Sequence, residues 1–204
     1  MSIIFILACY LYKVEIKIYK MKKILFILFL LPFVSNAQDI TLHGASFKRF
    51  MKVKESQLVY NGAGLRQKFG LDLYVSALYL PKKNSIANQV INANEMQAIQ
   101  IKIISNLVTR DKFNQVVAEG FENSSHGTAT NSERETFKGF FSADIKKGDD
   151  ILLLYKPGKG VAAIINGKFM GKVEGIEFKK ALWAIWLGDK PANDKLKSKM
   201  LGNI

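Results

Sequence analysis

Apolar and polar residues alternate along several stretches of this chain, and this period of two is typical of half-buried β-strands. The clearest case is 97–107, where isoleucines at every second position are separated by polar residues. Shorter strands are predicted at residues 40–43, 57–60, 151–156, 161–165 and 168–173. The pair Asn166-Gly167 between the last two strands is a strong signal for a two-residue β-hairpin turn.

The longest extended segment lies between residues 61 and 81, and the rest of the predicted fold is organised around it. It opens with a predicted glycine-rich turn at 62–64 and ends at Pro81. Aromatic and branched apolar residues are frequent over 69–79, which favours a strand over a helix. One cation, Arg66, follows the predicted turn, at the mouth of this apolar strand.

A period of three to four residues predicts helices in the second half of the chain. Thr109 can cap a helix over 110–123, because a threonine hydroxyl can accept from a free backbone N–H of the first turn. Further helices are predicted over 133–145, 176–187 and 194–201, with one or two helical turns within 85–91. The order of these elements predicts an α+β fold with a mainly antiparallel sheet and helices packed on one side.

The N-terminal residues have the layout of a secretory signal peptide at 21–37. Two lysines precede an apolar run over 24–31, and the small residues Ser35-Asn36-Ala37 provide a cleavage site after Ala37. Residues 1–20 are then an upstream extension, and the domain is 38–204. This layout predicts an exported protein, periplasmic or secreted. An uncleaved N-terminal anchor is the alternative, but lysines and a glutamate interrupt the apolar runs that it would use.

Composition narrows the possible chemistry of the domain. The only cysteine, Cys9, lies before the predicted cleavage site, so the domain has no disulfide and no thiol nucleophile. The chain has a net charge of +13; residues 1–37 hold five lysines and one glutamate, a net +4, which leaves about +9 for the domain. The lysines are spread along the chain without a nucleic-acid-binding motif, so we predict no nucleic acid partner. A basic surface that associates with an anionic envelope is the remaining charge-based hypothesis.

The sequence offers little for metal or nucleophilic chemistry. The two histidines, His43 and His126, are far apart and no ligand spacing accompanies them, so no metal or other cofactor is predicted. Arg66 is the single candidate, since a guanidinium beside an apolar sheet could hold a carboxylate or a developing oxyanion. The competing interpretation is a structural ion pair between Arg66 and Asp72 or Glu119.

Phenylalanines at helical spacing could line an apolar ligand pocket between sheet and helices. The competing interpretation is that they form ordinary core. These residues are Phe113, Phe121, Phe137, Phe140 and Phe141.

Several motifs together resemble the chalcone isomerase superfamily, in particular its exported bacterial chalcone-isomerase-like branch. They are NGAGLR with YVSALYLP, then VTRDKFNQVVAEGF, GKFMGKVEG and ALWAIWLGDKP. The resemblance covers nearly all of residues 38–204. It implies an open-faced β-sandwich, in which a long antiparallel sheet is covered by helices with an apolar cleft between them.

The resemblance also implies a role for Arg66, because an arginine at this position of the GAG-x-R motif faces the ligand in the family. Plant enzymes of the family close a chalcone to a flavanone with the help of a threonine and a tyrosine. Here those two positions hold Tyr74 and Phe113, and phenylalanine cannot donate a hydrogen bond. Other members bind fatty acids. The sequence therefore favours a protein that binds a fatty-acid-like or other apolar anion, with Arg66, Tyr74 and Phe113 lining the site. An intramolecular lyase of the chalcone isomerase type is the alternative.

Overall fold

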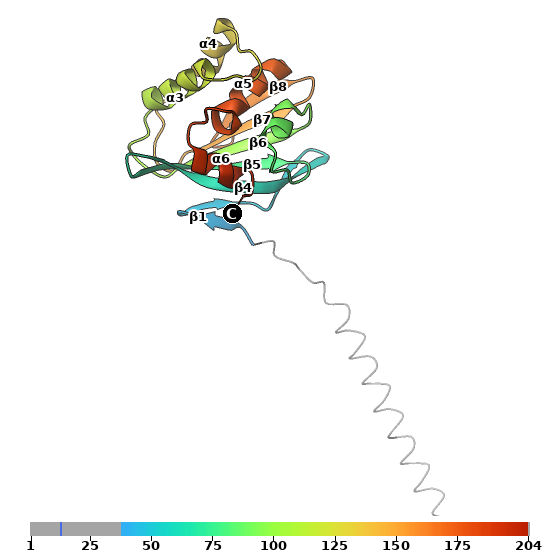
Figure 1. The fold of residues 1–204 in the computed structure, drawn as a ribbon. Coiled ribbons are helices and arrows are strands. Elements are labelled where there is room, and N and C mark those ends of the chain that lie inside the picture. Colours follow the sequence, from blue (N-terminus) through green and yellow to red (C-terminus); the bar gives the residue numbers. More distant parts are fainter. Residues whose placement is uncertain (1–12, 14–37, 204) are drawn as a thin grey trace, which may run out of the picture. The chain divides into compact units, whose positions relative to one another are not determined.

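The computed structural model describes Lys13 and residues 38–203, and the domain consists of strands and helices around one curled sheet (Figure 1). Apart from Lys13, the predicted upstream extension and signal peptide lie outside the described residues. The strands are β1 (Ile40–Leu42), β2 (Ala45–Phe47), β3 (Phe50–Val53), β4 (Ser56–Lys68), β5 (Leu71–Leu80), β6 (Gln97–Ile103), β7 (Asp150–Lys156), β8 (Gly160–Ile165) and β9 (Lys168–Val173). The helices are α2 (Ala87–Asn92), α3 (Arg110–Glu122), α4 (Asn131–Gly139), α5 (Ile176–Leu187) and α6 (Asp194–Met200).

The large sheet has seven strands in the order β3-β4-β5-β6-β7-β8-β9, and every neighbouring pair is antiparallel. Each strand therefore pairs with the next strand along the chain. The helix α2 lies in the connection between β5 and β6, and α3 and α4 lie in the connection between β6 and β7. The mainly antiparallel sheet predicted from the alternating pattern is confirmed.

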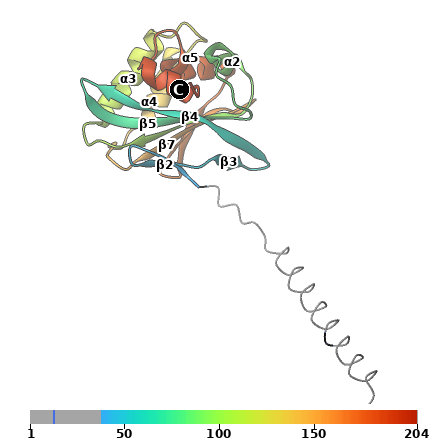
Figure 2. The ribbon, with the colours of Figure 1, turned by 60° about the horizontal axis from the view of Figure 1, so that its bottom comes forward.

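The two faces of the sheet are covered differently. Figures 1 and 2 show the helices on one side of the sheet and the small β1–β2 hairpin on the other. The helical side holds the larger core, in which residues of α5 such as Trp183 and Ile185 are almost fully buried. On the other side, Phe47 packs with apolar residues of β4 and β5 such as Val75. Both faces of the central strands are buried, which explains the nearly continuous apolar sequence at the end of β5.

The predicted glycine-rich turn at 62–64 is wrong, because β4 continues through these residues without a break. A β-carbon on Gly64 would lie 2.9 Å from the Lys199 β-carbon and 3.0 Å from the Leu196 δ-carbon of α6. The glycines therefore allow α6 to pack closely on β4. Besides a positive φ, the close approach of another segment is a reason that a backbone position requires glycine. The actual turn is at Phe69-Gly70, where both residues have positive φ.

Several local predictions are confirmed by the structure. The Thr109 hydroxyl caps α3 by accepting from the backbone N–H of Lys112. The Asn166-Gly167 pair forms the predicted hairpin turn between β8 and β9, with φ of 50° and 79°. The helix predicted over 176–187 is α5 with the same bounds.

Other boundaries differ from prediction. The helix predicted over 133–145 is α4, which begins earlier because Thr130 and Glu133 form a capping box, and which ends at Gly139. The strand predicted over 97–107 ends at Ile103. The strand β3 was not predicted, since its sequence is short and basic. In the part of the chain that the structure describes, no helix is both long and apolar enough to cross a bilayer.

Candidate functional site

A cleft of about 320 Å³ opens between the β4–β5 hairpin and the beginning of α3. This volume lies at the lower end of the range of small-ligand pockets, which is about 300–1,000 Å³. The lining is predominantly apolar, and its apolar residues are Phe69, Leu71, Leu73, Leu107, Val108, Phe113, Val116, Val117 and Trp186. The polar and charged lining residues are Arg66, Lys68, Tyr74, Lys112, Gln115 and Glu119. The cleft thus offers a small polar region within apolar walls.

Arg66 and Tyr74 lie side by side in the cleft because of the strand register. They are direct partners across the β4–β5 pair, and an irregularity in the register follows between Arg66 and Gln67. Residues that face one another across an antiparallel pair have β-carbons about 5 Å apart, so their side chains can interact. The indole Nε1 of Trp186, on α5, donates to the Tyr74 hydroxyl oxygen at 3.2 Å. The sheet and one helix therefore hold the phenol in place.

The Tyr74 hydroxyl remains protonated at neutral pH. Burial raises the pKa of Tyr74, and the hydrogen bond from Trp186 and the charge of Arg66 oppose this shift only in part. Since the Trp186 bond uses Tyr74 as acceptor, the phenolic proton is available to donate to another group. A buried phenol beside a guanidinium is suited to bind an anionic oxygen.

Arg66 does not form the structural ion pair that was the competing interpretation. Among residues 38–203, no carboxylate lies within 4.0 Å of its guanidinium. Asp72 instead accepts from the Gln67 side chain at 2.6 Å, and Glu119 accepts from the Gln115 side chain at 2.8 Å. Nη1 of Arg66 donates to the Gln67 carbonyl oxygen at 2.9 Å, and a hydrogen bond from the guanidinium is also among the effects that lower the pKa of Tyr74.

Phe113 lies in the cleft wall and is 4% exposed. Its ring packs on Phe141 with centroids 4.8 Å apart. The other phenylalanines that were candidates for a pocket pack on one another or on Phe178, and none of them lines this cleft. Ordinary core is therefore the correct interpretation for most of them, and Phe113 alone serves both core and cleft.

Trp186 was not among the predicted site residues; it lies on α5, the helix predicted over 176–187. The position of α5 depends on a buried cation, Lys179, which is 0% exposed. Its Nζ donates to the carbonyl oxygens of Val90, Ile91 and Ala93 at 2.8–3.0 Å. These carbonyls lie at the C-terminal end of α2, where helix carbonyls lack partners. Lys179 thereby joins α5 to α2.

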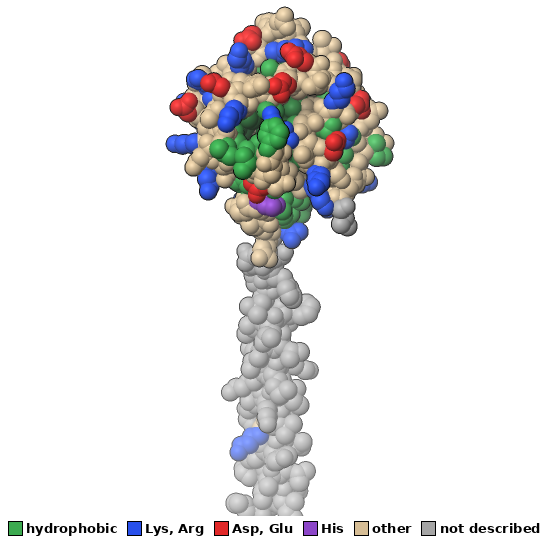
Figure 3. All heavy atoms as spheres, turned by 60° about the vertical axis from the view of Figure 1, so that its left-hand side comes forward, with side chains coloured by type: hydrophobic (Ala, Val, Ile, Leu, Met, Phe, Trp, Pro, Cys, Tyr) green, Lys and Arg blue, Asp and Glu red, His purple; other side chains and the backbone are tan. Residues whose placement is uncertain are grey.

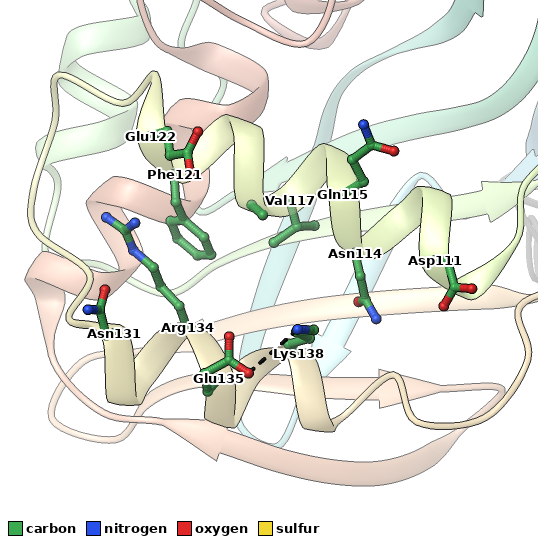
Figure 4. A pocket seen from close by; sticks show the side chains of 11 residues that line it. Asp111, Asn114, Gln115, Val117, Phe121, Glu122, Asn131, Arg134, Glu135 and Lys138 are labelled. Atoms are coloured by element: carbon green, nitrogen blue, oxygen red, sulfur yellow. Dashed lines mark ion pairs between the residues drawn. The ribbon is translucent and has the colours of Figure 1, made fainter.

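A second hollow of about 480 Å³ lies between α3 and α4 (Figure 4). Its lining carries charges of both signs, including an ion pair between Glu135 and Lys138 at 3.6 Å. Arg134 donates to the Ala129 carbonyl oxygen at 2.9 Å and stacks over the Phe121 ring. Because its apolar lining is limited to Val117, Ala118 and Phe121, this hollow is less suited to an apolar ligand than the Arg66 cleft.

The histidines do not form a catalytic or metal site in the described residues. No group of three or more potential metal ligands occurs there. The Ser125 hydroxyl donates to Asp189 at 2.7 Å and lies 3.3 Å from Nδ1 of His126. This order is unsuited to nucleophilic catalysis, since the carboxylate must orient the histidine and here it binds the serine.

Comparison with known proteins identifies relatives of this chain by sequence and by fold. A family model described as chalcone isomerase-like matches residues 39–202. Among solved structures, a fatty-acid-binding protein of Arabidopsis thaliana is similar, with a TM-score of 0.64 and 17% sequence identity. The match covers 80% of this chain and 96% of that chain. At this identity the likeness shows the shared fold, and it confirms the predicted fold class. No curated protein sequence matches the chain.

Proposed function

Because this chain belongs to the chalcone isomerase-like family, we propose that its cleft binds an apolar molecule with an acidic group, such as a fatty acid. The observation that carries this proposal is Arg66, a guanidinium without a carboxylate partner in residues 38–203, beside the buried hydroxyl of Tyr74. The name of the Arabidopsis relative, a fatty-acid-binding protein, supports the same ligand class.

The two parts of the cleft match the two parts of such a ligand. The carboxylate would accept from the Arg66 fork and from the Tyr74 hydroxyl, and charge-assisted hydrogen bonds of this kind are stronger than neutral ones. The apolar part of the ligand would lie along Leu73, Val116 and Val117. Its transfer from water to this apolar surface would stabilise the complex. The modest volume favours ligands with short chains or a single ring system over long-chain lipids.

The cyclisation of chalcones receives less support than binding. Phe113 stands where the resemblance expects a tyrosine hydroxyl, and its side chain has no polar atom that could orient a water or a substrate oxygen. The remaining polar groups, Arg66 and Tyr74, are sufficient to bind an anion. We therefore propose a binding protein, with the intramolecular lyase as the alternative.

We expect the substitution Arg66→Gln to weaken binding of a medium-chain fatty acid by about tenfold, because a partly exposed charge-assisted hydrogen bond is lost. Gln keeps part of the aliphatic stem, so the loss reports the charge more than the packing. The measurement is isothermal titration calorimetry with the fatty acid and with the fatty alcohol of the same length. The alcohol should bind the two proteins with similar affinity.

Arg49→Gln is the matched control, since Arg49 donates to the Gln38 carbonyl oxygen and does not line the cleft. It should leave the affinity for the fatty acid unchanged. Equal affinities of wild type and Arg66→Gln for the acid would contradict the proposed role of Arg66. A wild-type protein that binds neither acid nor alcohol would contradict the proposed function itself.

We further propose that the protein is exported and processed after Ala37, on the sequence pattern of residues 21–37. Expression from the Met1 codon in a bacterial host should give a mature protein that begins at Gln38. Intact-mass measurement of protein from the periplasmic or culture fraction checks this. Substitution of Ala37 by arginine should block processing and leave a longer product, whereas a mature mass that retains residues 21–37 in the wild type would contradict cleavage.

A further inference from the structure

Phe69 occupies a position that the fold does not explain. It is the first residue of the two-residue turn between β4 and β5, with φ of 53°, and its side chain is 91% exposed. This backbone conformation favours Gly, Asn or Asp, and a bulky residue in it is an outlier. The one aromatic contact recorded for the ring in the described chain is with Nζ of Lys68, 5.7 Å from its centroid. An exposed and strained aromatic residue at a hairpin tip calls for a functional account.

Phe69 is part of a larger surface around the opening of the cleft. We define this cleft rim by its exposed apolar residues Phe69, Leu71 and Leu107 and its lysines Lys68 and Lys112. Leu71 is 52% exposed and Leu107 is 43% exposed. Nζ of Lys112 donates to the Leu107 carbonyl oxygen at 3.2 Å, which joins the loop before α3 to the first turn of the helix. Hydrophobic side chains gather around a hollow on the face shown in Figure 3, with lysine and arginine side chains beside them.

The charge of this surface points to an anionic partner. Three cations line the cleft, namely Lys68, Lys112 and Arg66, against one carboxylate, Glu119, which accepts from Gln115. Long lysine side chains can keep their charge in the head-group layer while apolar side chains enter the acyl boundary. Exposed aromatic and aliphatic groups beside lysines are the composition that binds the interface of an anionic bilayer.

We propose that the cleft rim docks on an anionic lipid bilayer, with Phe69 inserted at the level of the acyl boundary and Lys68 and Lys112 on the head groups. The inference rests on the proposed function, because a cleft that opens against a bilayer can exchange a poorly soluble apolar anion without releasing it into water. Three apolar side chains around a hollow bury too little area for a stable protein–protein interface. A lipid bilayer is fluid and adapts to this shape.

Vesicle co-sedimentation tests the docking with the processed protein, residues 38–204, which form a compact unit. Wild type should bind vesicles of phosphatidylcholine with about one-third phosphatidylglycerol more tightly than vesicles of phosphatidylcholine alone, and added salt should weaken the binding. Phe69→Asn should lower the partition by about tenfold, since Asn suits the turn and removes the inserted ring. All variants begin at Gln38, so the apolar run over 24–31 does not contribute to vesicle binding.

The chain provides a matched control at the β8–β9 hairpin, whose turn lies at the same end of the sheet, three strands away from β5. Lys168-Phe169 repeats the Lys68-Phe69 pair, and Phe169 is 60% exposed but does not line the cleft. Phe169→Asn should bind anionic vesicles as wild type does. As a second readout, brominated lipid should quench the tryptophan in Phe69→Trp but not the one introduced in Phe169→Trp, after subtraction of the native tryptophan signal.

The results separate this inference from the proposed function. Equal vesicle binding by wild type and Phe69→Asn, an equal loss in Phe169→Asn, or no preference for anionic lipid would each overturn the docking. None of these outcomes bears on the fatty-acid affinity measured without vesicles. That affinity still tests the proposed function. If the protein docks through Phe69 but does not bind fatty acid, the proposed function is wrong and the proposed docking surface still stands.

Discussion

The substitution Lys179→Met is expected to lower the free energy of unfolding by about 3 kcal/mol. Methionine fills a similar volume but leaves the carbonyl oxygens of Ile91 and Ala93 without the Lys179 donor, and each such group costs about 1–3 kcal/mol before local relaxation. The Val90 carbonyl oxygen keeps the donor from the Gln97 side chain, at 3.0 Å. Urea denaturation followed by circular dichroism measures the loss. Lys180→Met is the control, because Lys180 is the next residue of α5 and its recorded ion pair is with the half-exposed Glu177.

The cost of Lys179→Met should also depend on pH. Burial lowers the pKa of Lys179 to about 7 from an ordinary value of 10.5, and the negative charge of Glu95 opposes this shift only in part. Between these two pKa values the unfolded chain holds more protons than the folded one. The free energy of unfolding of the wild type therefore increases as the pH rises.

The stability gap between wild type and Lys179→Met should therefore widen from pH 6 to pH 9, by up to about 3 kcal/mol. Tyrosine ionisation affects both proteins in the same direction and largely cancels in the difference. The gap between wild type and Lys180→Met should change much less with pH, because the charge of Lys180 makes only the smallest of the three contributions to the lowered pKa of Lys179. An unchanged gap for Lys179→Met would mean that the buried lysine keeps its proton throughout this range.

The substitution Gly62→Val is the second change with a large expected effect. A β-carbon at Gly62 would overlap the Lys199 carbonyl oxygen and lie 2.9 Å from both the Gly202 nitrogen and the Met200 oxygen. These are backbone atoms at the end of α6, so a rotamer change cannot relieve the overlap. Overpacking of this kind costs about 1–3 kcal/mol or more, and here we expect the upper end, with α6 displaced from the sheet.

Thermal unfolding and hydrogen exchange of the α6 amides would measure this effect. Gly139→Val is the matched control, because nothing lies within 4 Å of a β-carbon at Gly139. It should change the free energy of unfolding by less than about 0.5 kcal/mol. Protected α6 amides and an unchanged melting temperature in Gly62→Val would show that the helix does not pack against β4 as described.

The sequence predicted the features that depend on neighbouring residues. The Asn166-Gly167 turn and the Thr109 cap are specified within four residues, and both are confirmed. The role of Gly62 was not predictable in this way, because the group that requires it is on α6, more than 130 residues later in the chain. A glycine pair near a strand is equally compatible with a turn and with a close helix contact.

In the candidate site too, short motifs in the sequence were informative, whereas contacts between distant segments were not predictable. Arg66 and Tyr74 were named from a motif, but whether Arg66 would pair with Asp72 depended on the β4–β5 register. The register places Asp72 opposite Gln67 and Tyr74 opposite Arg66, so the ion pair does not form. Trp186 lies in the helix predicted over 176–187, but only the packing of α5 on the sheet brings its indole N–H to the Tyr74 hydroxyl.

The contact between α6 and β4 also determines the order in which the domain can be completed. Strands of the sheet pair with the next strand along the chain, so successive hairpins can form while the protein is being synthesised. The side chain of Asn61, however, donates to the Met200 carbonyl oxygen, and the glycine surface of β4 stays open until α6 has been translated. A chain whose first long strand is covered by a late helix remains incompletely folded during synthesis. For the export proposed above, this delay would keep the chain competent to be threaded through a translocation channel.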